Sequence, residues 1–447
     1  MATSVLSGKP ICGSLCGLID LAGGMSEQPL PSPAETSIGR AGLTPWLVIL
    51  LAATAWAGCF LFPPSWRALG VAEGNFVFLD LTGVLASGEA AQLGLNPYLP
   101  NPLDVYHRPH VYTEWWLVTG RLGLTRQDVR WLGPVLIGLM LLSAVAVVRP
   151  VGRRQGLLML AVFVSPAVLM AVNRGNNDLV AFILMSGAFG LLRSARSPPR
   201  LLGIALLALA AVLKYYPLAA AVVLLDARSR REWLGWILLF GVVLVVAWPG
   251  LVPGLQSAAK YRPSPDWVHA FGAPVIFRDF ALTPPPSWLL MGGALAVAGW
   301  AARGGWCEVT ASEESLNAER EFAGAAAVVV GCFALGSSYA YKLIFALWLL
   351  PWLWRTTLDK RSERWRRVTL GLLLAVLWLD GLLSLAVNTV IPPGHPTFAL
   401  RLMQTGLIVS QLLSWAFVIC LLRGLVIYAV PRMARLCGRR LGRRGVA

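Results

Sequence analysis

Apolar residues recur along this chain in stretches of about 15 to 25 residues, with short polar segments between them. Because about 20 apolar residues span a bilayer, the pattern predicts an all-α polytopic membrane protein. We expect ten transmembrane helices, at residues 46–62, 131–148, 156–172, 179–192, 233–248, 287–302, 322–337, 343–354, 368–390 and 402–428.

One apolar segment, residues 201–225, does not fit a single crossing. Arginines flank it at both ends, with Arg200 before it and Arg228 after it. Basic residues mark the cytoplasmic side, and two full crossings would need about 40 residues. We therefore predict a re-entrant hairpin that turns near Lys214. Such broken backbone is tolerated at membrane depth only where protein buries it or a cavity adjoins it.

The charge distribution sets the expected orientation. The chain is 57% hydrophobic and 13% charged, with a net charge of +16. Its basic residues gather in short segments between apolar stretches, as the positive-inside rule predicts, so the charge does not indicate nucleic-acid binding. We expect a plasma (inner) membrane protein with a disordered cytoplasmic tail at 1–44, a transmembrane domain at 45–428 and a basic cytoplasmic tail at 429–447. Two large loops, 63–130 with juxtamembrane helices and 249–286, would face the exterior or periplasm.

Cofactor chemistry has no support in the sequence. The seven cysteines are odd in number, and none has metal-ligand spacing. No P-loop, GxSxG, HExxH or EF-hand pattern occurs. We expect no cofactor and see no implied divalent metal.

Asp80 lies early in the first outer loop, between apolar residues beside the membrane surface. There its pKa could be raised and the carboxylate could act as a base. A helix cap or a plain surface acid is the alternative reading.

Three cations stand out near the predicted outer surface. Arg174 lies in a tight turn with Asn176 and Asp178, where Asp178 could instead cap the next helix and pair with Arg174. Lys214 interrupts the apolar hairpin, and Lys342 begins another apolar stretch. An anion such as a phosphate could bind Arg174 and nearby backbone amides.

Aromatic and polar residues surround these cations in the predicted outer regions. Interfacial Trp and Tyr are common in membrane proteins, so an aromatic belt is an equal alternative to a substrate site. The candidate lining residues of a substrate cavity are Asn176, Asp178, Tyr215, Tyr216, Tyr339, Tyr341, Asn96, Tyr98, Glu114 and His107.

Taken in order, four short motifs resemble glycosyltransferase family 87, the polyprenyl-phosphate-mannose-dependent type within the GT-C superfamily. They are the segment around Asp80 followed by Gly94–Tyr98, then Arg174-Gly175-Asn176-Asn177-Asp178, Leu213-Lys214-Tyr215-Tyr216-Pro217 and Ser338-Tyr339-Ala340-Tyr341-Lys342. They cover roughly residues 75–350.

The resemblance implies a GT-C-like fold and a hexosyltransferase of the cell envelope. Its donor would be a sugar, mannose in the first place, on a polyprenyl phosphate, and its acceptor a lipid or glycan. Asp80 would act as general base with inversion at the anomeric carbon, and Lys214, Arg174 and Lys342 would bind the donor phosphate. A secondary transporter, a flippase for lipid-linked glycans, or a ligase that moves a whole glycan are the alternatives.

Overall fold

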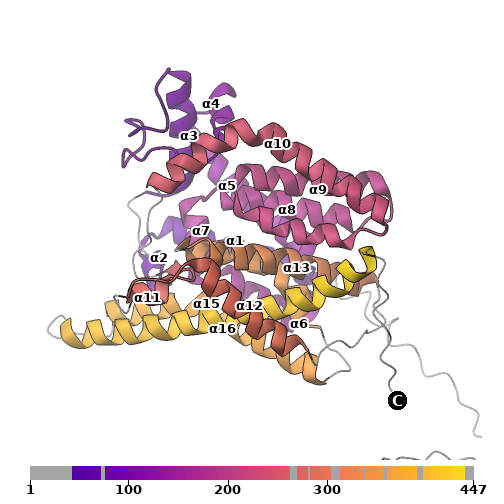
Figure 1. The fold of residues 1–447 in the computed structure, drawn as a ribbon. Helices are drawn as coiled ribbons and strands as arrows, with labels where there is room; N and C mark the ends of the chain where they lie inside the picture. Colours follow the sequence, from indigo (N-terminus) through magenta and orange to yellow (C-terminus); the bar gives the residue numbers. More distant parts are fainter. Residues whose placement is uncertain are drawn as a thin grey trace, which may run out of the picture. The chain divides into compact units, whose positions relative to one another are not determined.

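The computed structural model describes residues 43–71, 76–261, 269–279, 282–303, 313–336, 338–355, 360–389 and 396–437. Residues 1–42 of the predicted N-terminal tail and 438–447 of the predicted C-terminal tail lie outside these ranges. The described chain is helical apart from two strands of two residues each (Figure 1). These are β1 (Ala270–Phe271) and β2 (Ser338–Tyr339), which pair antiparallel and join the second outer loop to the segment before Lys342.

The helices of the first half lie in the predicted first outer loop and in the first predicted spans. In chain order they are α1 (Leu43–Leu61), α2 (Pro64–Ala68), α3 (Leu79–Gln92), η1 (Glu114–Leu117), α4 (Val118–Arg121), η2 (Arg126–Asp128), α5 (Val129–Val148), α6 (Gly152–Phe163), α7 (Pro166–Arg174) and α8 (Asp178–Leu192). The segments labelled η are 3₁₀-helices. Short helices are thus present within residues 63–130, while the position of this segment outside the membrane stays a prediction.

The second half contains α9 (Ser197–Leu213), η3 (Tyr216–Asp226), α10 (Arg230–Tyr261), α11 (Val275–Asp279), α12 (Ser287–Ala302), α13 (Glu313–Ala334), η4 (Ala340–Leu349), α14 (Leu350–Leu353), α15 (Lys360–Thr389) and α16 (Pro396–Leu436). Helices α15 and α16 run side by side as the two long helices at the bottom of Figure 1. The small residues of α13 allow η3 and η4 to pack closely against it.

Among the described residues, five helices are long and apolar enough to cross a membrane. They include α1, α5, α10, α15 and α16, and α6 with α7 makes a sixth if the bent pair is one span. Exposed apolar side chains such as Val245 on α10 suit contact with lipid. An all-α membrane protein is therefore supported, whereas ten crossings remain a prediction, since several apolar helices have only 10–17 residues.

Two predicted spans differ in detail from the structure. The span predicted at 156–172 is two helices that meet at an angle of 55°. Pro166 causes this break, because it lacks an N–H and cannot continue the hydrogen-bond pattern of α6. The span predicted at 343–354 is mainly the 3₁₀-helix η4, which apolar periodicity does not distinguish from an α-helix.

The segment predicted as a hairpin folds back on itself. Helix α9 ends at Leu213, the backbone of Lys214 is extended, and η3 begins at Tyr216. Arg200 on α9 donates a hydrogen bond to the carbonyl of Asp226, at the far end of η3, over 3.2 Å. The two ends therefore lie within one side chain's reach, while a re-entrant position in a membrane stays a prediction.

Candidate active site

Phe78, in the predicted first outer loop, holds the start of α3 against the Arg174 turn. The backbone of Phe78 is left-handed, with a φ of 57°, a conformation that is strained for an aromatic residue. Such strained residues cluster at functional sites. The N–H of Phe78 donates to the carbonyl of Asn173 over 2.8 Å. Gly133 and Gly175 make room for the ring, since a Cβ at either would approach the ring carbons to 2.5 and 3.0 Å. Phe78 thereby fixes the position of Asp80, in the first turn of α3.

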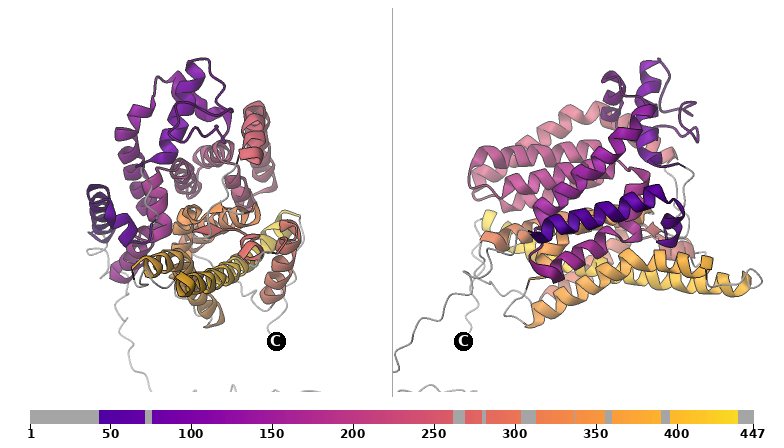
Figure 2. Two further views of the ribbon diagram at one scale, coloured as in Figure 1. Left: turned by 90° about the vertical axis from the view of Figure 1, so that its left-hand side faces the viewer. Right: turned by 180° about the vertical axis from the view of Figure 1, so that it is seen from behind.

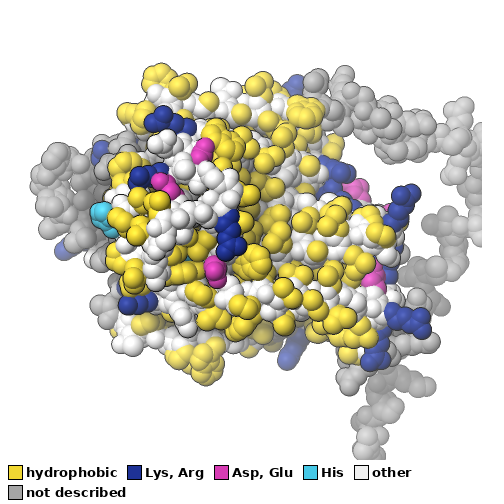
Figure 3. Space-filling model, turned by 90° about the horizontal axis from the view of Figure 1, so that it is seen from above, with side chains coloured by type: hydrophobic (Ala, Val, Ile, Leu, Met, Phe, Trp, Pro, Cys, Tyr) yellow, Lys and Arg dark blue, Asp and Glu magenta, His cyan; other side chains and the backbone are white. Residues whose placement is uncertain are grey.

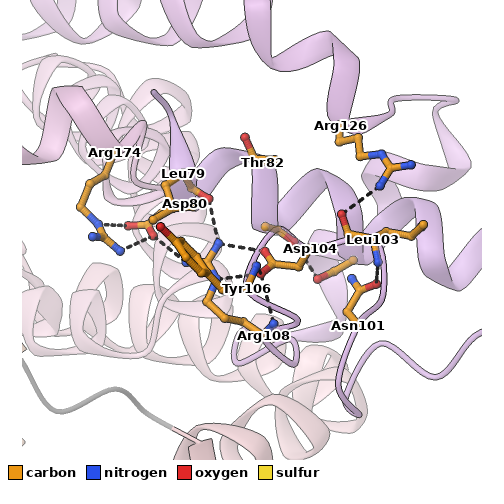
Figure 4. A network of polar contacts seen from close by, with 12 residues as sticks. Leu79, Asp80, Thr82, Asn101, Leu103, Asp104, Tyr106, Arg108, Arg126 and Arg174 are labelled. Atoms are coloured by element: carbon orange, nitrogen blue, oxygen red, sulfur yellow. Dashed lines mark hydrogen bonds and ion pairs between the residues drawn. The ribbon is translucent and has the colours of Figure 1, made fainter. Parts of the chain in front are cut away.

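Asp80 meets the Arg174 turn directly. Arg174 donates to both carboxylate oxygens, from Nε over 2.8 Å and from Nη2 over 2.7 Å (Figure 4). Asn176 donates to the same carboxylate over 2.6 Å. The alternative pairing of Arg174 with Asp178 was wrong. A short turn suggested that pairing, but the tertiary fold brings in a carboxylate from 94 residues away.

Arg108 makes the fourth contact with Asp80, from Nη1 over 3.4 Å. Asp104 holds this arginine in place, accepting from its backbone N–H, its Nε and its Nη2 (Figure 4). Burial raises the pKa of Asp80, but the charges and hydrogen bonds of Arg174, Asn176 and Arg108 outweigh it, so the pKa lies below its ordinary value. The predicted rise in the Asp80 pKa is therefore wrong.

Lys214 is connected to Asp80 through Asn176 rather than directly. Its Nζ pairs with Asp178 at 2.6 Å and approaches the Oδ1 of Asn176 to 3.5 Å. Asn176 links Asp80 to the start of α8, because its Nδ2 donates to the Asp80 carboxylate and its Oδ1 accepts from the backbone N–H of Asp178. We call these residues, with Arg108 and Arg174, the Asp80 cluster.

Aromatic rings surround the cations of the Asp80 cluster. Arg174 lies 5.3 Å from the ring centre of Tyr339, which stacks on Tyr341. Lys214 lies 4.4 Å from the ring centre of Tyr112 and 5.9 Å from that of Tyr216. Cations are attracted to aromatic faces at such distances. The motifs around residues 174, 214 and 339 therefore converge on Asp80.

Lys342 and Tyr98 join this group through other rings. The Nζ of Lys342 lies 4.9 Å from the ring centre of Tyr216. Tyr98 packs on His110, and His110 on Tyr112, in a row of rings that leads to Lys214. Burial lowers the pKa of His110 to about 4, so its ring is neutral at neutral pH.

Four predicted residues lie farther out. Asn96 accepts from the N–H of Tyr98 and forms a local turn, and His107 is exposed on the loop. Glu114 begins η1 and Tyr215 lies beside Gly254, where a Cβ would approach its hydroxyl to 2.5 Å. Among the described residues, no side-chain hydrogen bond, ion pair or ring contact joins Asn96, His107 or Glu114 to the Asp80 cluster.

Sequence reasoning missed the roles of Arg108, Asp104 and Phe78. Asp104 and Arg108 are four residues apart, a spacing that signals an ion pair only in a helix, and here they lie in a loop. No three His, Cys, Asp or Glu residues lie close enough to hold a metal ion within the part of the chain that the structure describes.

The face above the Asp80 loop is mostly apolar. Viewed from above, hydrophobic side chains cover much of this side of the molecule, and basic and acidic side chains lie in small groups among them (Figure 3). The two turned views place α3 and the loop after it at one end, away from α15 and α16 (Figure 2). Charged side chains thus lie beside an apolar surface that suits contact with lipid.

Comparison with known proteins identifies the family. The model of glycosyltransferase family 87 matches residues 124–379, more than half of the chain. The match includes the Arg174 turn, Lys214 and Lys342, whereas Asp80 precedes it. No match was found among curated proteins or among solved structures. The chain thus belongs to glycosyltransferase family 87 and is a membrane glycosyltransferase.

Proposed function

We propose that this glycosyltransferase moves a hexose, mannose in the first place, from a polyprenyl-phosphate donor to a lipid or glycan hydroxyl at the outer face of the plasma membrane. The observation that carries the proposal is the contact of Asp80 with two partly exposed arginines. The side chains of Arg174 and Arg108 are 24% and 34% exposed, whereas that of Asp80 is 5% exposed. A buried base thus adjoins cations that an anionic ligand can reach.

The reaction makes one bond and breaks one. The acceptor oxygen attacks the anomeric carbon from the face opposite the phosphate, the bond from carbon to phosphate oxygen breaks, and the configuration inverts. Asp80 takes the acceptor proton. The polyprenyl phosphate leaves with added negative charge, which preorganised cations stabilise.

Asp80 must release one contact to act as a base. A carboxylate has about four lone-pair positions, and Asp80 accepts two contacts from Arg174, one from Asn176 and one from Arg108. The Arg108 contact is the longest, at 3.4 Å, and the most exposed. We infer that Arg108 turns towards the donor phosphate and leaves this position to the acceptor hydroxyl.

The cations then divide into two groups. Arg174 and Arg108 would touch the phosphate, and Lys342 stays a predicted third contact. Lys214 is buried and paired with Asp178, so it would shape the pocket from behind by holding Asn176 and Asp178. This changes the role first expected for Lys214 from direct contact to support.

The test is transfer by the purified protein in lipid. Radiolabelled mannose on a polyprenyl phosphate would be compared with the glucose analogue and with a nucleotide sugar, using membrane lipids as acceptors. We expect label in a lipid or glycan product from a polyprenyl-phosphate donor, with the anomeric configuration inverted. No transfer from any polyprenyl-phosphate donor, or a retained configuration, would contradict the proposal.

A further inference from the structure

The segment Tyr216–Asp226 is an unusually long 3₁₀-helix. It runs for 11 residues, whereas 3₁₀ runs longer than three or four residues are uncommon. Their hydrogen bonds have poorer geometry than those of an α-helix, and side chains three residues apart eclipse one another. The apolar residues of η3, rich in Ala, Val and Leu, do not themselves demand this conformation. The contacts that hold its two ends offer a cause.

Each end of η3 is fixed to another part of the protein. At the site end, Lys214 pairs with Asp178, and Trp116 donates to the carbonyl of Leu213 over 2.9 Å. At the far end, Asp226 pairs with Arg320 of α13 and with Arg432 of α16, the latter over 3.1 Å. The side chains of Asp226 and both arginines are at most 9% exposed.

The span between these ends matches the extended form. From Arg200 to Leu213, α9 rises about 20 Å at 1.5 Å per residue. The return path from Tyr216 to Asp226 has fewer residues, yet it ends beside Arg200. At 2.0 Å per residue η3 also covers about 20 Å, whereas an α-helix of the same residues would fall about 5 Å short.

We propose that Asp226 is a positioning residue of the active site, which it controls by keeping η3 stretched. The proposal rests on the proposed function of the Asp80 cluster. Once Asp226 releases Arg320 and Arg432, η3 shortens towards an α-helix and draws Lys214 away from Asp178. Asn176, which faces both Lys214 and Asp80, then loses its support. Donor binding weakens although no residue that touches the donor has changed.

The test compares Asp226→Asn with a matched control, Glu321→Gln. Glu321 of α13 pairs with Arg193 after α8, in an ion pair that does not involve η3 and whose side chains are 2% and 18% exposed. Cryo-electron microscopy of each variant in lipid nanodiscs, bound to an antibody fragment, gives the rise per residue over 216–226. Titration with polyprenyl-phosphate mannose gives kcat and the donor KM.

We expect residues 216–226 of Asp226→Asn to become α-helical, with a donor KM about tenfold higher and kcat within twofold of the wild type. Glu321→Gln should keep both the 3₁₀-helix and the KM. If Asp226→Asn does not fold, Arg432→Gln removes one of the two anchors and should shorten the segment in part.

A wild-type segment that is already α-helical would overturn the inference, as would a folded variant with an unchanged 3₁₀-helix. An altered helix with an unchanged KM would also contradict the link to the site. If the wild type transfers no sugar, the proposed function fails, while the rise over 216–226 still decides whether Asp226 stretches η3.

Discussion

In the described part of the chain, Asp80 and Asp226 each lie between two arginines, and the two groups differ in exposure. Asp80 lies between Arg108 and Arg174, whose side chains are 34% and 24% exposed. Asp226 lies between Arg320 and Arg432, whose side chains are 9% and 8% exposed. The arginines at Asp80 can therefore be reached by an anion, whereas those at Asp226 are closed off.

This difference in exposure suits the two groups to different roles. A buried ion pair is costly to break by removing one partner, because the other charge is left without compensation. A partly exposed arginine can instead exchange a carboxylate for a phosphate at small cost, since both are bidentate acceptors. The Asp80 group is suited to binding and chemistry, and the Asp226 group to holding helices in place.

The largest effect is expected from Arg174→Gln. The change removes a cation proposed to bind the leaving phosphate and the bidentate contact with Asp80, so kcat/KM should fall about 10²- to 10³-fold. Arg174→Lys should recover part of the rate, since it restores the charge without the fork geometry. Transfer kinetics and a thermal melt measure both; a melt lowered as much as by Arg320→Gln would remove the distinction between the two groups.

Arg320→Gln is the corresponding change at Asp226. It breaks a buried pair and should destabilise the protein by about 3–5 kcal/mol. Thermal unfolding in detergent, compared with the wild type and with Arg174→Gln, measures this. An unchanged melting temperature would show that the Asp226 group does not stabilise the helix bundle.

Arg108→Gln should change the pH dependence of transfer. Asp80 must be ionised to accept a proton. Because its pKa lies below the ordinary value of 3.8, the carboxylate stays ionised at lower pH than an ordinary aspartate does. Removing a cation raises that pKa, so the acidic limb of kcat/KM should move to higher pH. Arg126→Gln is the control, because Arg126 pairs with Glu89 on the same loop and does not touch Asp80. Equal shifts in both variants would exclude a specific effect of Arg108.

The smallest effect concerns His110, which stays neutral in the fold. Its pKa is lowered from 6.5 to about 4, so the unfolded chain binds a proton there that the native state does not. This difference reduces stability as the pH falls from about 6.5 to about 4. His110→Gln should flatten the dependence of Tm on pH over that range and leave it unchanged above pH 7. A slope equal to that of the wild type would contradict the burial of a neutral ring.

Hydrophobic patterns predicted the helical class of this protein but not the local conformation of its helices. Apolar stretches predicted a helical membrane protein, and the arginines around 201–225 predicted a chain that turns back near Lys214. Periodicity could not predict that η3 and η4 are 3₁₀-helices or that the chain bends at Pro166. The bend depends on the missing N–H of Pro166, and the 3₁₀ conformation depends on contacts with other parts of the fold, neither of which changes the apolar pattern.

The candidate site was predicted as a set of residues but not as a set of pairs. Asp80 and Arg174 were both identified, yet their contact joins residues 94 positions apart, and the nearer Asp178 competed for Arg174. Arg108 was not selected as a site residue, because a loop rich in polar residues does not show which cation faces the carboxylate. Pairing follows from the tertiary fold.

Asp80→Asn tests whether Asp80 takes the proton from the acceptor hydroxyl. The amide keeps the size of the side chain but cannot act as the base. In a single-turnover assay with polyprenyl-phosphate mannose, we expect the transfer rate to fall at least about 10³-fold, with donor still bound. A folded Asp80→Asn protein that transfers sugar at the wild-type rate would contradict the account.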